Sequence, residues 1–319
     1  MLKPTSIFLT ALCFVCAPSL LAGPIDLMNN YQLIVFNDLE STSEVDGKAL
    51  VMGDLNGTAS NYTTQQPQAL ANEVGLVVGG DLNVNVQVNN GYSAIVGGNN
   101  NGVVSLNGVG GVLSSDTSSY NFAQIQTDLI QYSSFLASLS SNSLLTQPSA
   151  CCGNASFDVG SSVGHDVAVF NIDSSDLFEN PFVQSYSLNL NTQTPSAIVI
   201  NVAGTDIDDS TYTANAISEF INSAISELII WNFHQSETLN LTKAIYGNVL
   251  APLATLTNHT EIKGSVVVNK HYQYGKIWGP SFSGAMPEDT PFIPEPTTSS
   301  VIALGLFVLG WRQNKKLQL

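Results

Sequence analysis

Charged side chains are scarce in this sequence, and positively charged ones are the scarcest. Only 11% of the 319 residues are Asp, Glu, Lys or Arg, against roughly 25% in an ordinary soluble domain. Nine Lys and Arg stand against 25 Asp and Glu, which gives a formal net charge of −16. Because proteins hold phosphate backbones chiefly through Lys and Arg, this balance excludes nucleic acid as a partner. Hydrophobic residues make up 44% of the chain, so a wholly disordered chain is excluded too.

Cysteine is also rare. Of the four cysteines, Cys13 and Cys16 lie in the first 23 residues, and the other two are the adjacent Cys151 and Cys152. Neighbouring Cα atoms lie about 3.8 Å apart, closer than the roughly 4.4–6.8 Å of ordinary disulfides, so a bridge between them would be strained. Three states are open in an oxidising compartment: a vicinal bridge, disulfides to another molecule, and two free thiols.

Motifs of catalytic chemistry are largely missing. The four histidines are too far apart to form the His-Glu-x-x-His helix of a metalloprotease, and no phosphate-binding loop occurs. We therefore predict that the protein is not an enzyme and needs no cofactor. The densest group of carboxylates is Asp206, Asp208 and Asp209, whose oxygens could bind calcium if a backbone carbonyl joined them. The favoured interpretation of this group is a solvated turn after a strand at Ile198–Val202.

The N-terminus has the layout of a secretory signal peptide. Lys3 precedes an apolar run from Ile7 to Val15, and the small residues Ala22 and Gly23 follow. We predict that residues 1–23 form a signal helix that is removed on export.

The C-terminus combines three features in order. Pro294, Glu295 and Pro296 precede the apolar stretch Ser299–Trp311, and the basic residues that follow are Arg312, Lys315 and Lys316. A helix of these 13 apolar residues would be about 20 Å long, short of the roughly 30 Å hydrocarbon core of a bilayer. By the positive-inside rule, the basic tail would stay in the cytoplasm and the body outside.

This C-terminal arrangement resembles the PEP-CTERM sorting signal of Gram-negative bacteria. The resemblance implies recognition by an exosortase, transient anchoring in the inner membrane, and transfer of the body to the cell surface or to an exopolysaccharide matrix. The chain therefore divides into a signal peptide (1–23), a body (24–285), a linker with the Pro-Glu-Pro motif (286–298) and a C-terminal hydrophobic segment with a basic tail (299–319).

The body contains short apolar runs that recur with Gly, Asn and Asp between them. The stretch Leu50–Asn56 recurs as Val77–Asn83 and, more loosely, as Ile95–Asn101, and Gly247–Ala251 recurs 17 residues later as Gly264–Val268. Steps of 16, 27 and 18 residues separate Asp38, Asp54, Asp81 and Asn99, with a polar insertion at Tyr62–Gln68 in the longest. Three short strands with tight corners need about that many residues, so the pattern predicts a mostly β fold, a parallel β-solenoid with one coil per step.

One segment has helical periodicity instead. Apolar residues at spacings of 3 and 4 predict one long α-helix from about Asn121 to Ser141, packed alongside the solenoid: Phe122, Ile125, Leu129, Tyr132, Leu136 and Leu139. A weaker helical pattern covers Ile217–Leu228 and merges into an apolar run ending at Phe233. The pattern does not distinguish helix from strand there.

The body resembles the choice-of-anchor A domain, a bacterial surface module with alternative anchors and no assigned active site. The motifs that carry the resemblance are Tyr31–Leu39, Val77–Asp81, Ile198–Gly204, Ile229–Phe233, Gly247–Pro252 and Ile262–Gly264. The runs Trp231–Phe233 and Leu250–Pro252 also make the body similar to the β-solenoid of bacterial ice-binding proteins, which lay a long helix along their coils.

Three functional hypotheses follow. The first is an exported adhesive or structural protein of the bacterial surface or biofilm matrix that binds extracellular polysaccharide, with its acidic charge favouring calcium-bridged contacts. The second is an ice-binding protein, which would favour a flat face with ranked threonines, and Thr211–Thr213 and Thr255–Thr257 offer the Thr-x-Thr spacing. The third is a polysaccharide-cleaving enzyme, supported by fold analogy alone.

Overall fold

The computed structural model describes residues 23–191, 193–212 and 214–286. The predicted signal helix, the Pro-Glu-Pro motif and the C-terminal hydrophobic helix lie outside these ranges. Within them, the backbone is a three-sided parallel β-solenoid, as the recurring motifs predict. One coil illustrates the plan: β1 (Leu33–Val35), β2 (Leu39–Ser41) and β3 (Glu44–Val45) lie on three successive sides. No helix in the described ranges is long and apolar enough to cross a membrane.

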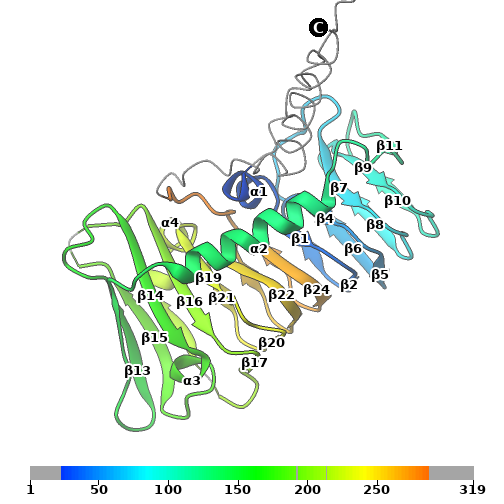
Figure 1. Cartoon of the computed structure of the whole chain (residues 1–319). Helices are drawn as coiled ribbons and strands as arrows, with labels where there is room; N and C mark the ends of the chain where they lie inside the picture. Colours follow the sequence, from blue (N-terminus) through cyan, green and yellow to red (C-terminus); the bar gives the residue numbers. More distant parts are fainter. Residues whose placement is uncertain (1–22, 192, 213, 287–319) are drawn as a thin grey trace, which may run out of the picture.

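The first side is the longest row of strands (Figure 1). In spatial order it contains β11 (Leu113–Ser114), β9 (Ser93–Val96), β7 (Val74–Val78), β4 (Ala49–Val51), β1, β24 (Val266–Gln273), β22 (Asn248–Asn258), β19 (Ile229–Asn232), β16 (Ala197–Ala203) and β14 (Val167–Asp173).

The second side continues the same sheet, because β22 and β24 bend around the corner and pair there again. Its other strands are β5 (Leu55–Gly57), β2, β20 (Thr238–Leu241) and β17 (Asp206–Asp208).

The third side has two sheets. The first contains β10 (Val104–Leu106), β8 (Asn85–Val88), β6 (Ala59–Tyr62), β3, β25 (Ile277–Trp278), β23 (Ile262–Lys263) and β21 (Ile245–Tyr246). The second contains β12 (Leu144–Thr146), β13 (Gly153–Asp158), β15 (Val183–Asn189) and β18 (Asn215–Ser218). Only the β12–β13 pair among the described strand pairs is antiparallel.

The coil repeat has the predicted register. Leu50 pairs with Val77, and Val77 pairs with Ile95, as the alignment of the three motifs requires. Val249 pairs with Val266 across the 17-residue step. The predicted insertion is shifted slightly, because Tyr62 ends β6 and is fully buried, so the extra residues begin after it.

The order of the coils differs from a simple succession along the chain. The first strand, β1, lies between β4 and the last long strand, β24. The chain therefore starts in the middle of the stack, builds coils toward β11, and crosses to the opposite end (Figure 1). It then returns through β14, β16, β19 and β22 until β24 closes the gap beside β1.

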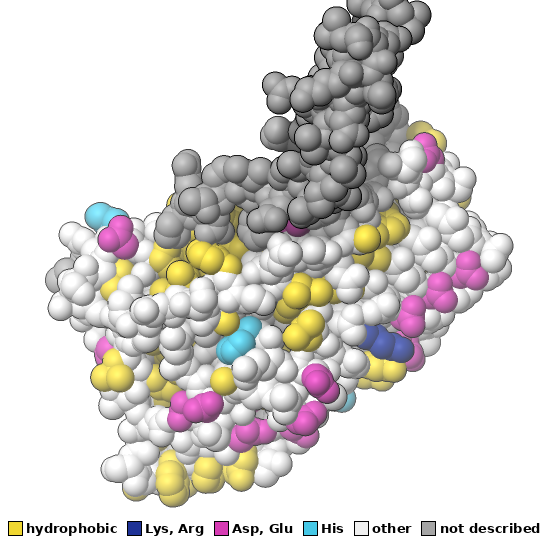
Figure 2. Space-filling model, in the orientation of Figure 1, with side chains coloured by type: hydrophobic (Ala, Val, Ile, Leu, Met, Phe, Trp, Pro, Cys, Tyr) yellow, Lys and Arg dark blue, Asp and Glu magenta, His cyan; other side chains and the backbone are white. Residues whose placement is uncertain are grey.

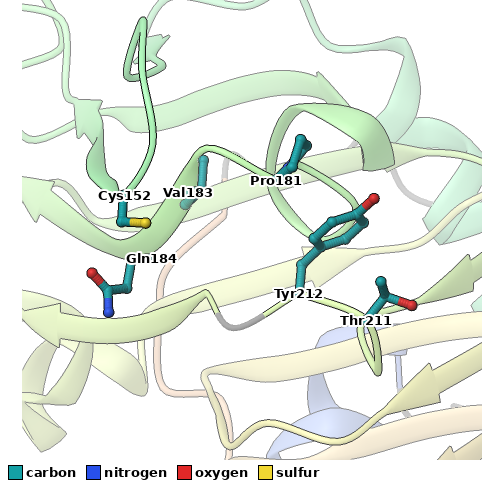
Figure 3. Close-up of a pocket in the computed structure, with 6 residues that line it drawn as sticks. All are labelled: Cys152, Pro181, Val183, Gln184, Thr211 and Tyr212. Carbon is teal, nitrogen blue, oxygen red and sulfur yellow. The ribbon is translucent and has the colours of Figure 1, made fainter.

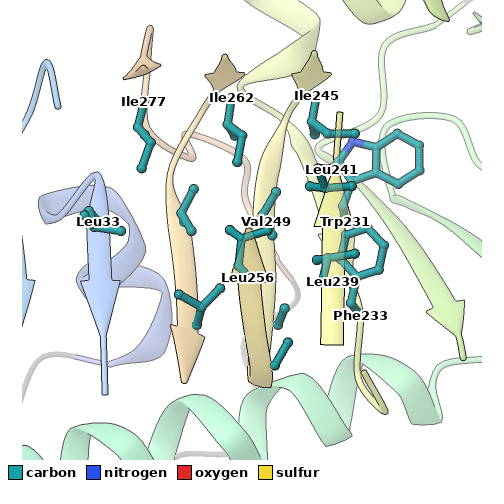
Figure 4. Close-up of a cluster of buried hydrophobic side chains, with 14 of the residues drawn as sticks. Leu33, Trp231, Phe233, Leu239, Leu241, Ile245, Val249, Leu256, Ile262 and Ile277 are labelled. Carbon is teal, nitrogen blue, oxygen red and sulfur yellow. The ribbon is translucent and has the colours of Figure 1, made fainter. Parts of the chain in front are cut away.

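Side chains alternate between two apolar clusters. In β1, Leu33 and Val35 point into the solenoid, while Ile34 between them belongs to the cluster under the helices. Figure 4 shows Ile245, Ile262 and Ile277, which pair in register on neighbouring strands, pointing into the same interior. The interior is therefore built from vertical rows of aliphatic side chains, which contain few groups that would require a polar partner.

The long helix α2 (Phe122–Ser138) makes the crossing along the first side. Four residues of the predicted stripe are buried beneath it, namely Ile125, Leu129, Tyr132 and Leu136. The helix ends earlier than predicted, because Leu139 already has extended backbone angles. The prediction of one long helix packed on the coils agrees with this arrangement.

A ladder of three asparagines holds the C-terminal turns of α2. Asn171, Asn201 and Asn232 are in register on β14, β16 and β19. Their Nδ2 groups donate to the carbonyls of Leu139 (3.1 Å), Leu136 (2.8 Å) and Ser133 (2.9 Å), respectively. Asn232 and Asn201 also donate to the side chain of the next asparagine. The last four carbonyls of a helix lack their i+4 amide partner, so the ladder supplies donors at Leu136 and Leu139 and adds a further bond at Ser133, one turn earlier.

The remaining helices are short. They are α1 (Pro24–Asn30), α3 (Ser174–Leu177), α4 (Ser223–Ser226) and the 3₁₀ turn η1 (Glu219–Ile221). The ambiguous segment from Ile217 to Phe233 therefore contains the end of a strand, two short helical turns and strand β19. Both ends of the described body meet above α2, because Leu27 and Met28 share an apolar cluster with Phe282.

Asn232→Leu should lower the free energy of unfolding by about 3 kcal/mol, since loss of the fully buried amide leaves Asn201 Oδ1 without its donor and the buried Ser133 hydroxyl without its acceptor. Urea denaturation followed by circular dichroism measures the change. The matched control is Asn83→Leu at an exposed asparagine of a surface row, where a change within about 0.5 kcal/mol is expected. Equal losses in the two variants would contradict the role of the asparagine ladder.

Candidate functional site

The second side of the solenoid presents two parallel rows of outward side chains, which we call the ladder face. One row contains Asp206, Thr238, Thr255 and Lys270, paired in that order across β17, β20, β22 and β24. The other contains Asp208, Asn240, Thr257, Tyr272, Glu40 and Asn56, and continues to Asn83 and Asn101. The intervening residues, such as Ile207 and Leu239, are buried.

Toward the ends of the rows, neighbouring side chains hydrogen-bond to one another. Thr238 Oγ1 donates to Asp206 Oδ1 at 2.6 Å, and Asn240 Nδ2 donates to Asp208 Oδ1 at 3.0 Å. At the other end, Asn83 donates to Asn56 over 2.9 Å, and Asn101 donates to Asn83 over 2.8 Å. These bonds hold the polar groups in a regular array, one strand spacing of about 4.8 Å apart.

A line of carboxylates borders the ladder face at one corner. Asp38, Asp54 and Asp81 each accept a hydrogen bond from the backbone N–H of the equivalent residue in the next coil, at 3.2, 2.7 and 2.6 Å. The last of these donors is the amide of Asn99, which lowers the pKa of the exposed Asp81 carboxyl. Figure 2 shows acidic side chains following one another along the coils, beside a basic side chain. The repeated Asp therefore has a structural role at the corner.

One lysine interrupts this acidic border. Lys270 Nζ lies 3.6 Å from Asp38 Oδ2 and 5.4 Å from the centre of the Tyr272 ring. Both members of the ion pair are partly exposed, so the pair contributes little to stability.

The three candidate calcium ligands do not converge. A turn is predicted at these residues, but Asp206–Asp208 form the strand β17, which pairs with β20. Asp206 and Asp208 point outward from this strand. Asp209 turns inward and is only 4% exposed. Within the described ranges, no group of three or more His, Cys, Asp or Glu side chains is placed to hold a metal ion. The geometry therefore adds no support to the calcium hypothesis.

Asp209 instead fixes a loop. Its Oδ1 accepts from Thr242 N at 2.5 Å and Thr242 Oγ1 at 2.7 Å, and its Oδ2 accepts from Lys243 N at 3.2 Å. Burial raises the pKa of this carboxyl, and the hydrogen bonds from Thr242 and Lys243 oppose the shift. The alternation of Asp206, Ile207 and Asp208 along a strand could have indicated this inward position.

The Thr-x-Thr pairs lie in different environments. Thr255 and Thr257 are both on the ladder face, where Thr238 extends the first row by one threonine. Asp206 and Lys270 end that short threonine row on its two sides. Thr211 is exposed in a loop, and Thr213 lies outside the described residues.

The two adjacent cysteines form a vicinal disulfide, with both residues exposed. They precede β13, and Cys152 borders a hollow of about 220 Å³ together with Pro181, Val183, Gln184, Thr211 and Tyr212 (Figure 3). Of the three states that the sequence leaves open, the structure has the vicinal bridge.

A wider polar groove of about 700 Å³ lies at the opposite ends of the same strands. Its lining includes Ser156, Ser187, Asn189, Glu219 and Asn222. Hydroxyl and amide groups dominate this surface, so it can donate and accept many hydrogen bonds. Neither hollow was predicted, because the sequence pattern does not show where β13, β15 and β18 begin and end.

One segment between strands has the spacing of a catalytic motif. Gly160, Ser162 and Gly164 match the Gly-x-Ser-x-Gly spacing of a nucleophile elbow, which places its serine between a strand and a helix. Here the segment is a turn between the strands β13 and β14, so the required context is missing. The nearby His165 ring nitrogen Nδ1 contacts the carbonyl of Thr194.

The family comparison covers almost all of this fold. A family model described as "Putative Ice-binding-like adhesive domain" matches residues 24–277. The chain belongs to this family. The match to the ice-binding-like adhesive domain lies inside the predicted body, 24–285, and ends in β25. Among curated proteins, none matches the sequence.

Two solved structures are similar to this member of the ice-binding-like adhesive family. One is an ice-binding protein from the Antarctic ascomycete Antarctomyces psychrotrophicus, 12% identical, with a TM-score of 0.32, covering 82% of this chain and 97% of that one. The other is an ice-binding protein from an Antarctic biological consortium, 13% identical, with a TM-score of 0.32, covering 88% and 95%. At these scores the likeness carries no argument, and the fold assignment stands on the strand pairing itself.

Asp209→Ala should destabilise the protein by about 2 kcal/mol, because the amides of Thr242 and Lys243 lose their acceptor. Thermal and urea unfolding measure the effect. Asp166→Ala, at an exposed aspartate of another loop, serves as the control, with an expected change within about 0.5 kcal/mol. If both variants behaved alike, Asp209 would not have the structural role described here.

Proposed function

We propose that this protein is an adhesive module of the bacterial surface or extracellular matrix that binds polysaccharide through the ladder face. Membership of the ice-binding-like adhesive family supports adhesion as the activity. The observation that carries the proposal is the pair of outward polar rows on a rigid, three-sided rod. A polysaccharide repeats its hydroxyl groups along the chain, so a regular array of amides and hydroxyls can bond to it at successive positions.

The chemistry of the ladder face favours a sugar polymer over a protein partner. The outward residues are mostly Asn, Thr and Asp, with Tyr272 as the one aromatic side chain in the two rows. Protein interfaces generally have an apolar centre with aromatic anchors. A surface of this kind gains its binding energy from many hydrogen bonds spread along a long ligand.

Export and anchoring complete the proposal. The body's likeness to the choice-of-anchor A domain and the C-terminal likeness to a PEP-CTERM signal support delivery by an exosortase after transient attachment to the inner membrane of a Gram-negative bacterium. Pro294, Glu295 and Pro296 would be the recognised triplet, and Arg312, Lys315 and Lys316 would keep the tail on the cytoplasmic side.

Ice binding is the second candidate. The description of the family and the row of Thr238 and Thr255, with Thr257 beside it, favour this candidate. Charged groups at both ends of that row oppose it, because Asp206 and Lys270 break the uniform threonine surface. Cleavage of polysaccharide gains no supporting arrangement of residues in the part of the chain that the structure describes.

The double variant Thr255→Arg/Thr257→Arg should weaken adsorption to extracellular polysaccharide by about tenfold, because two long side chains obstruct the flat rows. Binding isotherms of the purified protein on polysaccharide from the producing cells measure this. The matched control is Ser105→Arg/Gln87→Arg, at two outward, register-paired positions of the third side.

Thermal hysteresis, measured on the same samples, separates the two candidates. Adsorption without hysteresis supports the adhesive function. Hysteresis that Thr255→Arg/Thr257→Arg abolishes, without adsorption by the unaltered protein, would replace adhesion with ice binding.

Deletion of residues 294–319 should release the protein from the cell surface into the medium or leave it in the periplasm, because the predicted sorting signal is lost. Fractionation and immunoblotting of the producing bacterium follow its location. A variant that carries only Arg312→Gln, Lys315→Gln and Lys316→Gln tests the basic tail separately. Unchanged surface retention of the deleted chain would refute the sorting hypothesis.

A further inference from the structure

The hollow beside the vicinal disulfide lies where three parallel strands begin. Cys152 directly precedes β13, Pro181 precedes β15, and Tyr212 precedes β18. The parallel pairing of these strands brings the three preceding segments to the same edge of the sheet. The hollow is therefore positioned by the sheet rather than by a single loop.

The walls of the hollow combine apolar surfaces with uncharged polar groups. In Figure 3, Cys152 and Gln184 lie on one side, and Pro181 and Tyr212 lie on the other. The disulfide closes a small covalent ring between adjacent residues, so its soft, weakly polar sulfur atoms are held at the surface. None of the six lining residues is charged.

The polar groups of the hollow have spare hydrogen-bonding capacity. Within the described ranges, the side chains of Gln184, Thr211 and Tyr212 make no hydrogen bond to another residue. An amide and two hydroxyls provide both donors and acceptors. Together with the faces of Tyr212, Pro181 and the disulfide, they match a molecule that has an apolar face and a hydroxylated edge.

A single hexose ring has these properties and fits the size. The volume of about 220 Å³ is below the roughly 300–1,000 Å³ of sites for drug-sized ligands. A pyranose ring presents C–H groups on one face, which pack on aromatic and sulfur surfaces, and hydroxyls around its edge.

A polar surface continues from the hollow along the strands. On the outer face of the sheet, Asn154 Nδ2 donates to Ser187 Oγ at 2.8 Å, and Ser185 Oγ donates to Asn154 Oδ1 at 3.0 Å. Ser187 and Asn189 then line the wide polar groove. From Gln184 to Asn189 the strand covers about 17 Å, which is long enough for several linked sugar rings.

The charges along this path exclude acidic sugars. Asp158 pairs with Asn189 across β13 and β15, and Glu219 lines the groove. Among the residues that the structure describes, no Lys or Arg lines either hollow, and the chain as a whole has a net charge of −16. A uronic acid polymer would meet only repulsion here.

We propose that the Cys151–Cys152 disulfide and Tyr212 form a binding site for one ring of a neutral hexose polymer, whose next rings lie along β15 toward the groove at Asn189. The site rests on the proposed adhesive function, since it names a second sugar contact and the class of sugar. It is separate from the ladder face, so the two can be tested independently.

Titration of the full chain with cellotetraose, maltotetraose and mannotetraose, followed by calorimetry and saturation-transfer NMR, tests the site. At least one neutral tetrasaccharide should bind, and tetragalacturonate should not. Tyr212→Ala and Cys151→Ser/Cys152→Ser should each weaken that binding by about tenfold. Tyr274→Ala, at a tyrosine exposed elsewhere on the coils, is the matched control and should bind normally.

Reduction of the unaltered protein with a phosphine keeps the experiment decisive if the cysteine variant does not fold. Loss of binding with an unchanged circular dichroism spectrum, and recovery on reoxidation, supports the site. Undiminished binding after reduction or in Tyr212→Ala, equal binding of tetragalacturonate, or no binding of any neutral tetrasaccharide would overturn it. Continued adsorption to whole polysaccharide in those cases would leave the ladder-face proposal standing.

Discussion

The parallel register between coils is the constraint on which the rest of this structure depends. Backbone N–H and C=O groups on the strands bond to the neighbouring coils, so equivalent residues lie above one another about 4.8 Å apart. Whatever occurs at one position in a coil meets its own counterpart in the next. Apolar residues therefore form continuous interior rows, such as Ile245, Ile262 and Ile277. Stacked like charges would repel, which explains a composition with only 11% charged residues.

Asparagine and aspartate can occupy stacked positions because their side chains hydrogen-bond to the equivalent residues of the neighbouring coils. At the corner beside the ladder face, Asp54 accepts from the backbone of Asp81, so a carboxylate can follow a carboxylate without losing its hydrogen bond. Beneath α2, Asn201 both donates to Asn171 and receives a bond from Asn232. Hydrogen bonds between equivalent residues of neighbouring coils therefore occur both at the surface and under the helix. These bonds add to the rigidity of the body, which lets it present a flat polar face.

The local features of the fold could be predicted from the sequence, whereas the long-range ones could not. The match of Leu50, Val77 and Ile95 requires one coil per repeat, and the structure has that register. The repeat motifs do not indicate which coils become neighbours when they are far apart in the sequence. The placement of β1 beside β24 was therefore not predicted. The aliphatic strands on either side of that junction resemble all the others. Closeness in sequence groups Asp209 with Asp206 and Asp208, but β17 is a strand where a turn is predicted, and Asp209 is buried just after it. The adjacency of Cys151 and Cys152 in the sequence does not decide whether they bond to each other, so the vicinal disulfide could not be predicted.

The closing of the last coil against the first has a mechanical consequence. Residues 23–28 lie beside Phe282 near the last coil, but the chain then continues along the stack, where Ser283 N and Ala285 N donate to the carbonyls of Glu227 and Ser196, just before β19 and β16. A force applied beyond residue 286 would therefore load these two backbone bonds first. The β1–β24 junction, which joins the first and last coils, would carry the load only after that segment had detached.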